Sequence, residues 1–491
     1  MSWQDHYNRN LVSSEDAVRL VDSGARVYIP IYPHPGPLIH ALAARRDELR
    51  DVSIICDAPI EDPGWFDPDW AGSFSVTIEQ ILGEMGRSAL DRRIVDYIPM
   101  IFSTQFKRYS TDFGDVPPID VFMVVTSPPD ANGYCSFGGH LWNKRGFVRR
   151  SKKVIAQVDD SQIRTYGHNY VHVSEIDRFV EHTPAQLSEV EVAELLASVK
   201  DEGVRSELDK IVPVMDPRDR SEHLPFLVER EVKQIRRFAA YQCWIEPDEY
   251  AKTIAGYVSE LVGDGSVLQI GTGTPTRFLA TVGAFDDKKD LGWHSEMGIP
   301  GVISLIERGV ITGARKMLHK DKAIFGALLG ATYRELDYAH ENPLIEQLDV
   351  DYVAKATTAA LNDNMVSINN ALSVDLTGQI NAETVFGGRL MSGTGGQLDF
   401  QMGAVMSKGG RGITLLRSTA LGGIASRIVA QHEEGTIISV PRTFVDTIIT
   451  EYGVAQLLGK SNRERARELI SIAHPDFRAD LIKAAEKLFY P

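Results

Sequence analysis

Two short apolar runs, each followed by a turn rich in glycine or proline, constrain what this chain can fold into. Residues 266–270 read SVLQI and break at the turn GTGTP, after which apolar residues return with helical spacing up to Gly283. Residues 291–296 read LGWHSE and lead into the turn MGIPG, followed by a helical pattern that Gly309 can end. Short apolar runs bounded by turns favour strands, and apolar residues three and four apart favour helices. This order of elements predicts an open α/β fold with a mostly parallel sheet.

Glu296 ends the second of these runs. In a strand, alternate side chains share a face, so His294 and Glu296 are expected to point the same way. The carboxylate would then stand at the carboxyl end of its strand, beside the glycine turn of the neighbouring strand, which is where ligands bind in open α/β sheets. Local sequence alone leaves another interpretation open, in which Glu296 is a solvated loop residue or a charge at a helix N-terminus.

The same element order recurs along the chain. Both halves open with helix, strand, Gly/Pro turn and helix, which suggests two similar α/β domains. We expect an N-terminal domain over residues 1–242, including a charged helical connection over about 185–242, and a C-terminal domain over residues 243–491 that carries Glu296. Further strands are expected at residues 26–31, 53–56, 93–98, 121–126, 154–158, 323–330, 365–369, 372–376, 413–416 and 437–440.

Five groups of residues resemble, in order, signatures of the CoA-transferase family that groups 4-hydroxybutyrate CoA-transferases with acetyl-CoA hydrolases and transferases. They are SPPD with GYCSFG in residues 127–138, GWHSEM in 292–297, DLTGQ in 375–379, SGTGGQLDF in 392–400 and AHPDFR in 473–478. Together they cover nearly the whole chain. The resemblance implies two CoA-transferase-like α/β domains with the active site at their interface, Glu296 as the nucleophile, and a homodimer or larger assembly.

The activity that this resemblance implies is transfer of CoA between an acyl-CoA, such as acetyl-CoA, and a small carboxylic acid. By resemblance, Glu296 attacks the thioester and then carries CoA as a glutamyl thioester until a second acid arrives, which is a ping-pong path. Coenzyme A is then a substrate, and no tightly bound cofactor or metal is expected. Two alternatives stay open: an acyl-CoA hydrolase of the same family, and a non-catalytic CoA-binding protein.

Glycine-rich loops are the candidates for holding CoA, because backbone amides without a neighbouring Cβ can approach a ligand closely. An interpretation of residues 393–396 as tight turns is equally open. The candidate residues are Gly271, Thr272, Gly273, Thr274, Pro275, Gly393, Gly395, Gly396, Gln397 and Thr419. Many relatives place a lysine shortly after the position of Thr419; this chain does not, so Arg417 or Arg427 is expected to take its role.

The chemistry sets further expectations for the surroundings of Glu296. A nucleophilic carboxylate must be ionised yet poorly hydrated, and a closed apolar pocket, with Trp293 and Met297 as walls, would raise its pKa. Backbone amides of either glycine loop could stabilise the thioester oxygen. For His294, an orienting or packing role is favoured over proton transfer, because an ionised carboxylate needs no base.

Composition excludes several other classes of protein. A formal net charge of −15 over 491 residues argues against a general affinity for nucleic acid or acidic membranes. Three widely separated cysteines, with no CxxC pair, argue against structural zinc and disulfides and suit a reducing cytoplasm. No secretory signal or membrane-spanning run is evident, and no P-loop lysine follows the glycines, so the sequence does not predict a nucleoside triphosphatase.

Overall fold

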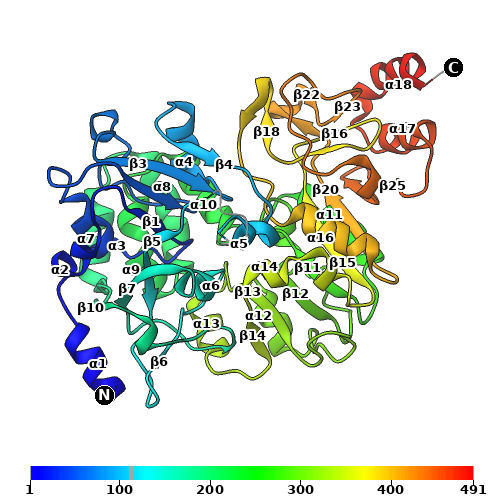
Figure 1. Cartoon of the computed structure of the whole chain (residues 1–491). Helices are drawn as coiled ribbons and strands as arrows, with labels where there is room; N and C mark the ends of the chain where they lie inside the picture. The colour runs from blue at the N-terminus through cyan, green and yellow to red at the C-terminus, as the bar shows by residue number, and fades with distance from the viewer. Residues whose placement is uncertain (1, 110–115, 490–491) are drawn as a thin grey trace.

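The computed structural model describes residues 2–109 and 116–489. It contains two large sheets that lie side by side in Figure 1, each with helices on its faces. The first sheet has seven strands, all parallel, in the order β10-β7-β5-β1-β2-β3-β4. Its strands are β1 (Arg26–Ile29), β2 (Val52–Cys56), β3 (Phe74–Glu79), β4 (Asp96–Ile98), β5 (Ile119–Thr126), β7 (Ser151–Val158) and β10 (Arg178–Glu181).

The second sheet has nine strands in the order β25-β24-β20-β15-β11-β12-β13-β14-β8, and only the β24–β25 pair is antiparallel. The predicted fold class, α/β with mostly parallel sheets, is therefore confirmed. Its strands are β8 (Tyr166–Gly167), β11 (Val267–Ile270), β12 (Gly292–Met297), β13 (Ala323–Ala327), β14 (Ile345–Gln347), β15 (Met365–Asn370), β20 (Arg411–Leu415), β24 (Thr447–Thr450) and β25 (Gly453–Gln456). The edge strand β8 comes from the first half of the chain.

Apolar side chains on both faces of the second sheet explain why its central strands read as continuous apolar runs. One face packs with α11 (Glu249–Leu261), α12 (Val302–Glu307) and α13 (Tyr333–Ala339), whose buried residues join Leu268, Ile270 and Trp293 in one core. The other face packs with α14 (Val350–Val353), α15 (Ala356–Ala359) and α16 (Gln397–Met406).

The core on this second face also joins the two halves. It contains Ile31, Phe102 and Trp142 from the first half together with Met297 and Phe400 from the second. The remaining helices of the two halves are α1 (Trp3–Asn10), α2 (Ser14–Ala17), α3 (Gly36–Ala43), α4 (Gly83–Asp91), α5 (Gln105–Arg108), α6 (Lys144–Val148), α17 (Asn462–Ser471) and α18 (Pro475–Phe489). Among the described residues, none of the helices combines the length and the apolar character needed to cross a bilayer.

Four helices form the charged segment between the halves: α7 (Glu189–Ser198), α8 (Glu202–Ile211), α9 (Pro217–Leu227) and α10 (Val232–Tyr241). The side chains of Ser188, Asp201 and Asp216 cap the first three by accepting hydrogen bonds from backbone amides. The four helices bury an apolar core of their own around Leu208, Leu224 and Ile235, and most of their charged residues occupy the outer faces.

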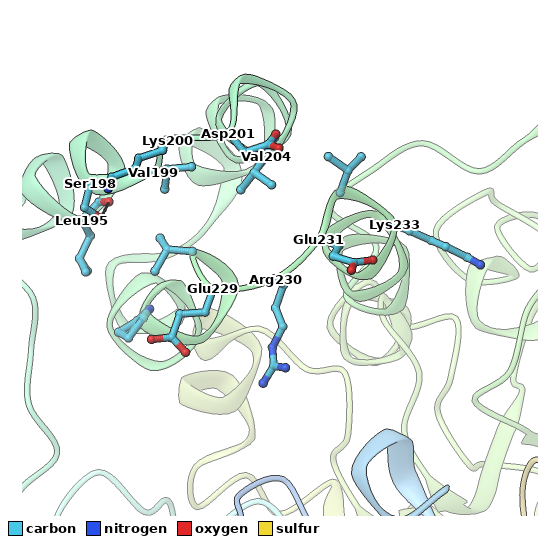
Figure 2. Close-up of a pocket in the computed structure, with 13 residues that line it drawn as sticks. Leu195, Ser198, Val199, Lys200, Asp201, Val204, Glu229, Arg230, Glu231 and Lys233 are labelled. Atoms are coloured by element: carbon cyan, nitrogen blue, oxygen red, sulfur yellow. Dashed lines mark hydrogen bonds between the residues drawn. The ribbon is translucent and has the colours of Figure 1, made fainter. Parts of the chain in front are cut away.

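A groove of about 870 Å³ opens between these helices. Figure 2 shows its wall of Lys200, Asp201 and Val204 on one side and Glu229, Arg230 and Lys233 on the other. Charges of both signs line the groove, and none of the candidate site residues does.

A small C-terminal layer completes the chain. It contains a three-stranded sheet of β16 (Ser373–Asp375), β17 (Ile380–Asn381) and β23 (Ile428–Val429), packed against α17 and α18. Two hairpins extend from it: β18 (Thr384–Val385) with β19 (Arg389–Leu390), and β21 (Thr419–Ala420) with β22 (Ala425–Ser426). The two-stranded pair β6 (Tyr134–Cys135) and β9 (Val171–His172) belongs to the first half.

Two sequence-based expectations for these elements are wrong, and one expected strand belongs to a smaller sheet. The run at residues 437–440 is not a strand of the main sheet; it makes a single bridge from Val440 to Ile380, and β24 takes the place beside β20. The strand expected at residues 372–376 is present as β16 (Ser373–Asp375), but it belongs to the three-stranded sheet. No α-helix follows the turn 271–275, because the hydroxyl of Thr276 donates to the carbonyl oxygens of Gly271 and Gly273 and holds the segment in one 3-10 turn.

Candidate active site

Glu296 lies near the carboxyl end of β12, on the face of the sheet covered by α16. Its residue is 5% exposed, and its backbone carbonyl lies against Gly326 of the neighbouring strand β13. Phe102 of the first half packs in the same core as Met297, the residue after Glu296. The carboxylate is thus enclosed where the two halves meet.

Two side chains donate hydrogen bonds to this carboxylate: Ser295, whose Oγ lies 3.2 Å from Glu296 Oε2, and Gln269. The Nε2 of Gln269 lies 3.3 and 3.4 Å from the two carboxylate oxygens. Its Oε1 accepts from Ser367 Oγ at 2.8 Å and from Asn369 Nδ2 at 2.9 Å. An ionised carboxylate can only accept hydrogen bonds, so the amide of Gln269 faces Glu296 with its nitrogen.

This hydrogen-bond network was not predicted from the sequence. Polar residues inside otherwise apolar runs, Gln269 in SVLQI and Ser367 with Asn369 in MVSINN, were the available signal. All three are buried, and buried polar side chains need partners. They belong to β11 and β15, adjacent strands of the sheet, which is why they meet.

Gly396, the residue before α16, lies close to Glu296. A carbon atom in the Cβ position of Gly396 would lie 3.1 Å from Glu296 Oε1, 3.1 Å from the ring of Phe102 and 3.3 Å from the ring of Phe400. Gly396 immediately precedes α16, whose first amides have no partners within the helix. The N-terminus of α16, which carries the positive end of the helix dipole, therefore lies close to the carboxylate.

Gln397, the first residue of α16, carries a further donor. Its side chain is 6% exposed, and its Nε2 is buried without a hydrogen-bond partner among the described residues. An unpaired buried donor costs free energy unless a ligand satisfies it. Gln397 was a sequence-based candidate for CoA binding, and the structure places it directly after Gly396.

Burial raises the pKa of Glu296 to about 7, from an ordinary value of 4.5. The negative charge of Asp399, in the first turn of α16, raises this pKa further, whereas hydrogen bonds from the backbone, Ser295 and Gln269 oppose the shift. Burial also raises the pKa of Asp399 to about 6. Near neutral pH a substantial share of Glu296 is therefore ionised, and the carboxylate is poorly hydrated, as a nucleophile of this kind requires.

The neighbours of Glu296 along β12 have different surroundings. His294 is fully buried, its Nε2 lies 3.0 Å from the carbonyl oxygen of Val353, and burial lowers its pKa to about 3, so the imidazole is neutral. The expectation that Trp293 forms a wall beside Glu296 is wrong: its ring packs 5.7 Å from that of Phe325, on the opposite face of the sheet.

The turn 271–275 packs against Asn369 and Asn370, at the end of β15. A Cβ at Gly271 would lie 2.5 Å from Asn369 Oδ1, and one at Gly273 would lie 2.5 Å from Asn370 Nδ2. Asn370 in turn donates to Thr276 Oγ1 at 2.7 Å. These glycines therefore let the turn pack closely against the asparagines of β15. Thr272 and Gly273 are at least partly exposed, Thr274 is exposed and Pro275 is buried.

The other glycine loop runs along the first half of the chain. A Cβ at Gly393 would lie 2.0 Å from the carbonyl oxygen of Gln80, and Gly395 forms a parallel bridge with Ile101. Thr419 belongs to the β21–β22 hairpin, and its carbonyl oxygen accepts a hydrogen bond from Arg427. The structure does not bring Thr419 into contact with Glu296 by any described interaction.

Arg427 and Arg417, the two residues expected to replace the family lysine, both already have partners within the chain. Arg427 donates to the carbonyl oxygens of Thr419 and Leu372, at 3.1 Å each. Arg417 pairs with Asp248 at 3.0 Å and lies over the ring of Tyr250. Binding of a phosphate by either one would require it to leave these partners.

Replacing Glu296 by glutamine should stabilise the fold, and more so at alkaline pH. Between pH 4.5 and about 7 the folded chain holds a proton on Glu296 that the unfolded chain has released, so stability falls as pH rises. Urea unfolding should show the variant more stable by roughly 1–3 kcal/mol at pH 8 and nearly equal to the native chain at pH 4. A difference of the same size at both pH values would contradict the raised pKa.

Comparison with known proteins decides the family. Two family models match: the acetyl-CoA hydrolase/transferase N-terminal domain over residues 1–191 and the C-terminal domain over residues 332–485. A succinyl-CoA:cyclohexane-1-carboxylate CoA transferase from Geobacter metallireducens is 34% identical over 99% of this chain and 97% of its own length. The chain belongs to the acetyl-CoA hydrolase/transferase family. The predicted family is thereby confirmed.

Other proteins are similar to this chain over nearly the full length of both. The 4-hydroxybutyrate coenzyme A transferase of Clostridium kluyveri is 32% identical, with all of both chains covered. RipA from Yersinia pestis has a TM-score of 0.80 at 28% identity over all of both chains. The crystal structure of a 4-hydroxybutyrate CoA-transferase from Porphyromonas gingivalis has a TM-score of 0.71 at 26% identity, covering 99% of this chain and all of the other. The chain is an enzyme of the CoA-transferase class.

Proposed function

We propose that this enzyme moves CoA from an acyl-CoA, such as acetyl-CoA, to a small carboxylic acid through a covalent intermediate on Glu296. The observation that carries the proposal is a buried carboxylate held by Gln269 and facing Gly396 and the N-terminus of α16. This arrangement offers a nucleophile and, beside it, backbone amides that can stabilise a thioester oxygen.

The reaction proceeds in balanced steps. A carboxylate oxygen of Glu296 attacks the thioester carbonyl, the CoA thiolate leaves, and an acyl-glutamyl anhydride forms. The thiolate then attacks the glutamyl carbonyl, which releases the first carboxylic acid as its anion and leaves CoA bound as a thioester to Glu296. A second carboxylate repeats these steps in reverse. One thioester replaces another, so the exchange needs no nucleoside triphosphate.

Enclosure of Glu296 favours transfer over hydrolysis. The residue is 5% exposed, and exclusion of water protects an anhydride or a thioester at this position from hydrolysis. Acyl-CoA hydrolysis remains the second candidate, and a non-catalytic CoA-binding protein is the third. As parts of the same proposal, coenzyme A is a substrate rather than a bound cofactor, the enzyme is a homodimer or larger, and it works in the cytoplasm.

The test is mass spectrometry of the peptide that carries Glu296, after incubation with candidate acyl-CoAs and a rapid quench. We expect a CoA adduct on Glu296 that disappears when an acceptor acid such as acetate is added. If free CoA is released at a rate that does not depend on the acetate concentration, the result would favour the hydrolase. Absence of an adduct with every acyl-CoA tried, together with no exchange, would favour the non-catalytic protein.

A further inference from the structure

Residues 389–399 of the second half lie along the first half over their whole length. Arg389 pairs with Asp91, and the carbonyl oxygen of Met391 accepts a hydrogen bond from Arg87 at 3.0 Å. Gly393 packs against Gln80 and Tyr97, and Gly395 bridges to Ile101. The segment that ends at α16 is thus positioned by residues far away in the sequence.

The last of these contacts is made by Ser103. Its Oγ donates to Asp399 Oδ1 at 2.7 Å, and its backbone N–H donates to Asp399 Oδ2 at 3.1 Å. Asp399 is 3% exposed and lies in the first turn of α16. One residue of the first half therefore holds both oxygens of a buried carboxylate of the second half.

Two observations connect this contact to Glu296. First, Gly396 lies between two residues that contact the first half: Gly395, which is bridged to Ile101, and Asp399. Gly396 itself lies against Glu296 Oε1. Second, Asp399 is the charged group whose field acts on Glu296; the other neighbours, Gln269, Ser295 and neutral His294, carry no charge. A shift of Asp399 would change both the distance of Gly396 and the field at Glu296.

We propose that Ser103 is a positioning residue for Glu296, acting across the two halves through Asp399 and the first turn of α16. Its two hydrogen bonds keep Asp399 ionised and in place, and this fixes the amide end of α16 against the nucleophile. The contact makes the reactivity of Glu296 depend on the two halves being joined. The proposal rests on the function proposed above, since it assigns Ser103 a role in the chemistry of Glu296.

Loss of the Ser103 hydroxyl should lower the pKa of Glu296. The hydrogen bonds from Ser103 oppose the rise in the pKa of Asp399 that burial causes. Without the hydroxyl, Asp399 takes up a proton more readily, its negative charge is lost over more of the pH range, and the pKa of Glu296 should fall. The carboxylate would then be ionised at lower pH, but less basic and less well aligned with the amide end of α16.

The test compares Ser103→Ala with Ser103→Thr, which restores a hydroxyl, and with Thr104→Val as a matched control. Thr104 lies in the same short helix, and its hydroxyl donates only to the carbonyl oxygen of Ile101 in the described structure. Formation of the Glu296 adduct in a single turnover is measured against pH. We expect Ser103→Ala to slow it about 10-fold or more, as for loss of a hydrogen bond to a charged group, with the midpoint of the pH profile lowered and KM for acyl-CoA unchanged.

Two further variants complete the design. Asp399→Asn should lower the midpoint at least as far, and adding Ser103→Ala to it should move the midpoint little further, because Asp399→Asn has already removed the charge through which Ser103 acts. Thr104→Val should match the native enzyme, and Ser103→Thr should recover part of the lost rate. Equal midpoints in the native enzyme and Ser103→Ala, or additive effects of the two substitutions, would overturn the proposal.

A second readout does not depend on activity. For each variant, the unfolding free energy is compared with that of the same variant carrying Glu296→Gln, and the pH dependence of the difference reports the titration of Glu296. The titration should move to lower pH in Ser103→Ala and stay in place in Thr104→Val; no movement in Ser103→Ala would overturn the proposal. Failure of the native enzyme to form any adduct would instead contradict the proposed function, and the titration would still test the contact.

Discussion

Replacing Glu296 by glutamine should abolish CoA exchange, with a rate loss on the order of 10⁵ or more, because the covalent path replaces a reaction between separate molecules by one within the site. Glutamine has nearly the same size and keeps a carbonyl oxygen toward Gln269, so the cavity is preserved. The measurement is exchange of labelled acid into acyl-CoA, followed by mass spectrometry of the same peptide.

A matched control is Glu335→Gln. Glu335 is also a buried glutamate whose pKa is raised by burial, and it caps α13 through Thr332, a role that glutamine can fill. Exchange should persist in this variant. Exchange at the native rate in Glu296→Gln, with the fold shown intact by urea unfolding, would contradict the assignment of the nucleophile.

Replacing Gly396 by alanine should slow formation of the Glu296 adduct by roughly 10²–10³, the range for loss of one well-aligned donor to a developing oxyanion. The new methyl group would lie 3.1 Å from Glu296 Oε1 and against two aromatic rings, so the carboxylate or the loop must move. The φ angle of Gly396 is −87°, which alanine adopts readily, so the chain should still fold.

The control for this substitution is Gly263→Ala. Gly263 has no atoms within 4 Å of its Cβ position and no positive φ angle, so alanine meets neither a clash nor strain there. Its activity should equal that of the native enzyme. A normal rate of adduct formation in Gly396→Ala would show that the approach of Gly396 to Glu296 is not used in the reaction.

The central strands were predictable from sequence because burial on both faces leaves a continuous apolar run. Residues 121–126 and 266–270 follow this rule, and both are strands at nearly the expected bounds. Short runs could not be distinguished from buried loops: the strands β10 and β14 were missed, and the apolar run at 437–440 was taken for a strand. Periodicity alone does not distinguish these cases over three or four residues.

The residues of the active site also divide into those that the sequence predicts and those that it does not. Glu296 could be found because the residues around it form a local pattern, and a turn follows its strand. Its partners could not, since Gln269 lies 27 residues away, Asn369 lies 100 residues from Gln269, and Ser103 lies 296 residues from Asp399. Such contacts follow from strand order and from the docking of one half on the other, which a single sequence does not contain.

The short strand β8 has a consequence for how this protein can be divided. It comes from residues 166–167 and completes the edge of the second sheet beside β14. A fragment beginning after the helical segment would leave the outer backbone groups of β14 unpaired, and an open strand of this kind recruits other copies into aggregates. The two fragments should therefore be most soluble when they are expressed together, because β8 of the first fragment can then pair with β14 of the second as soon as the second is synthesised.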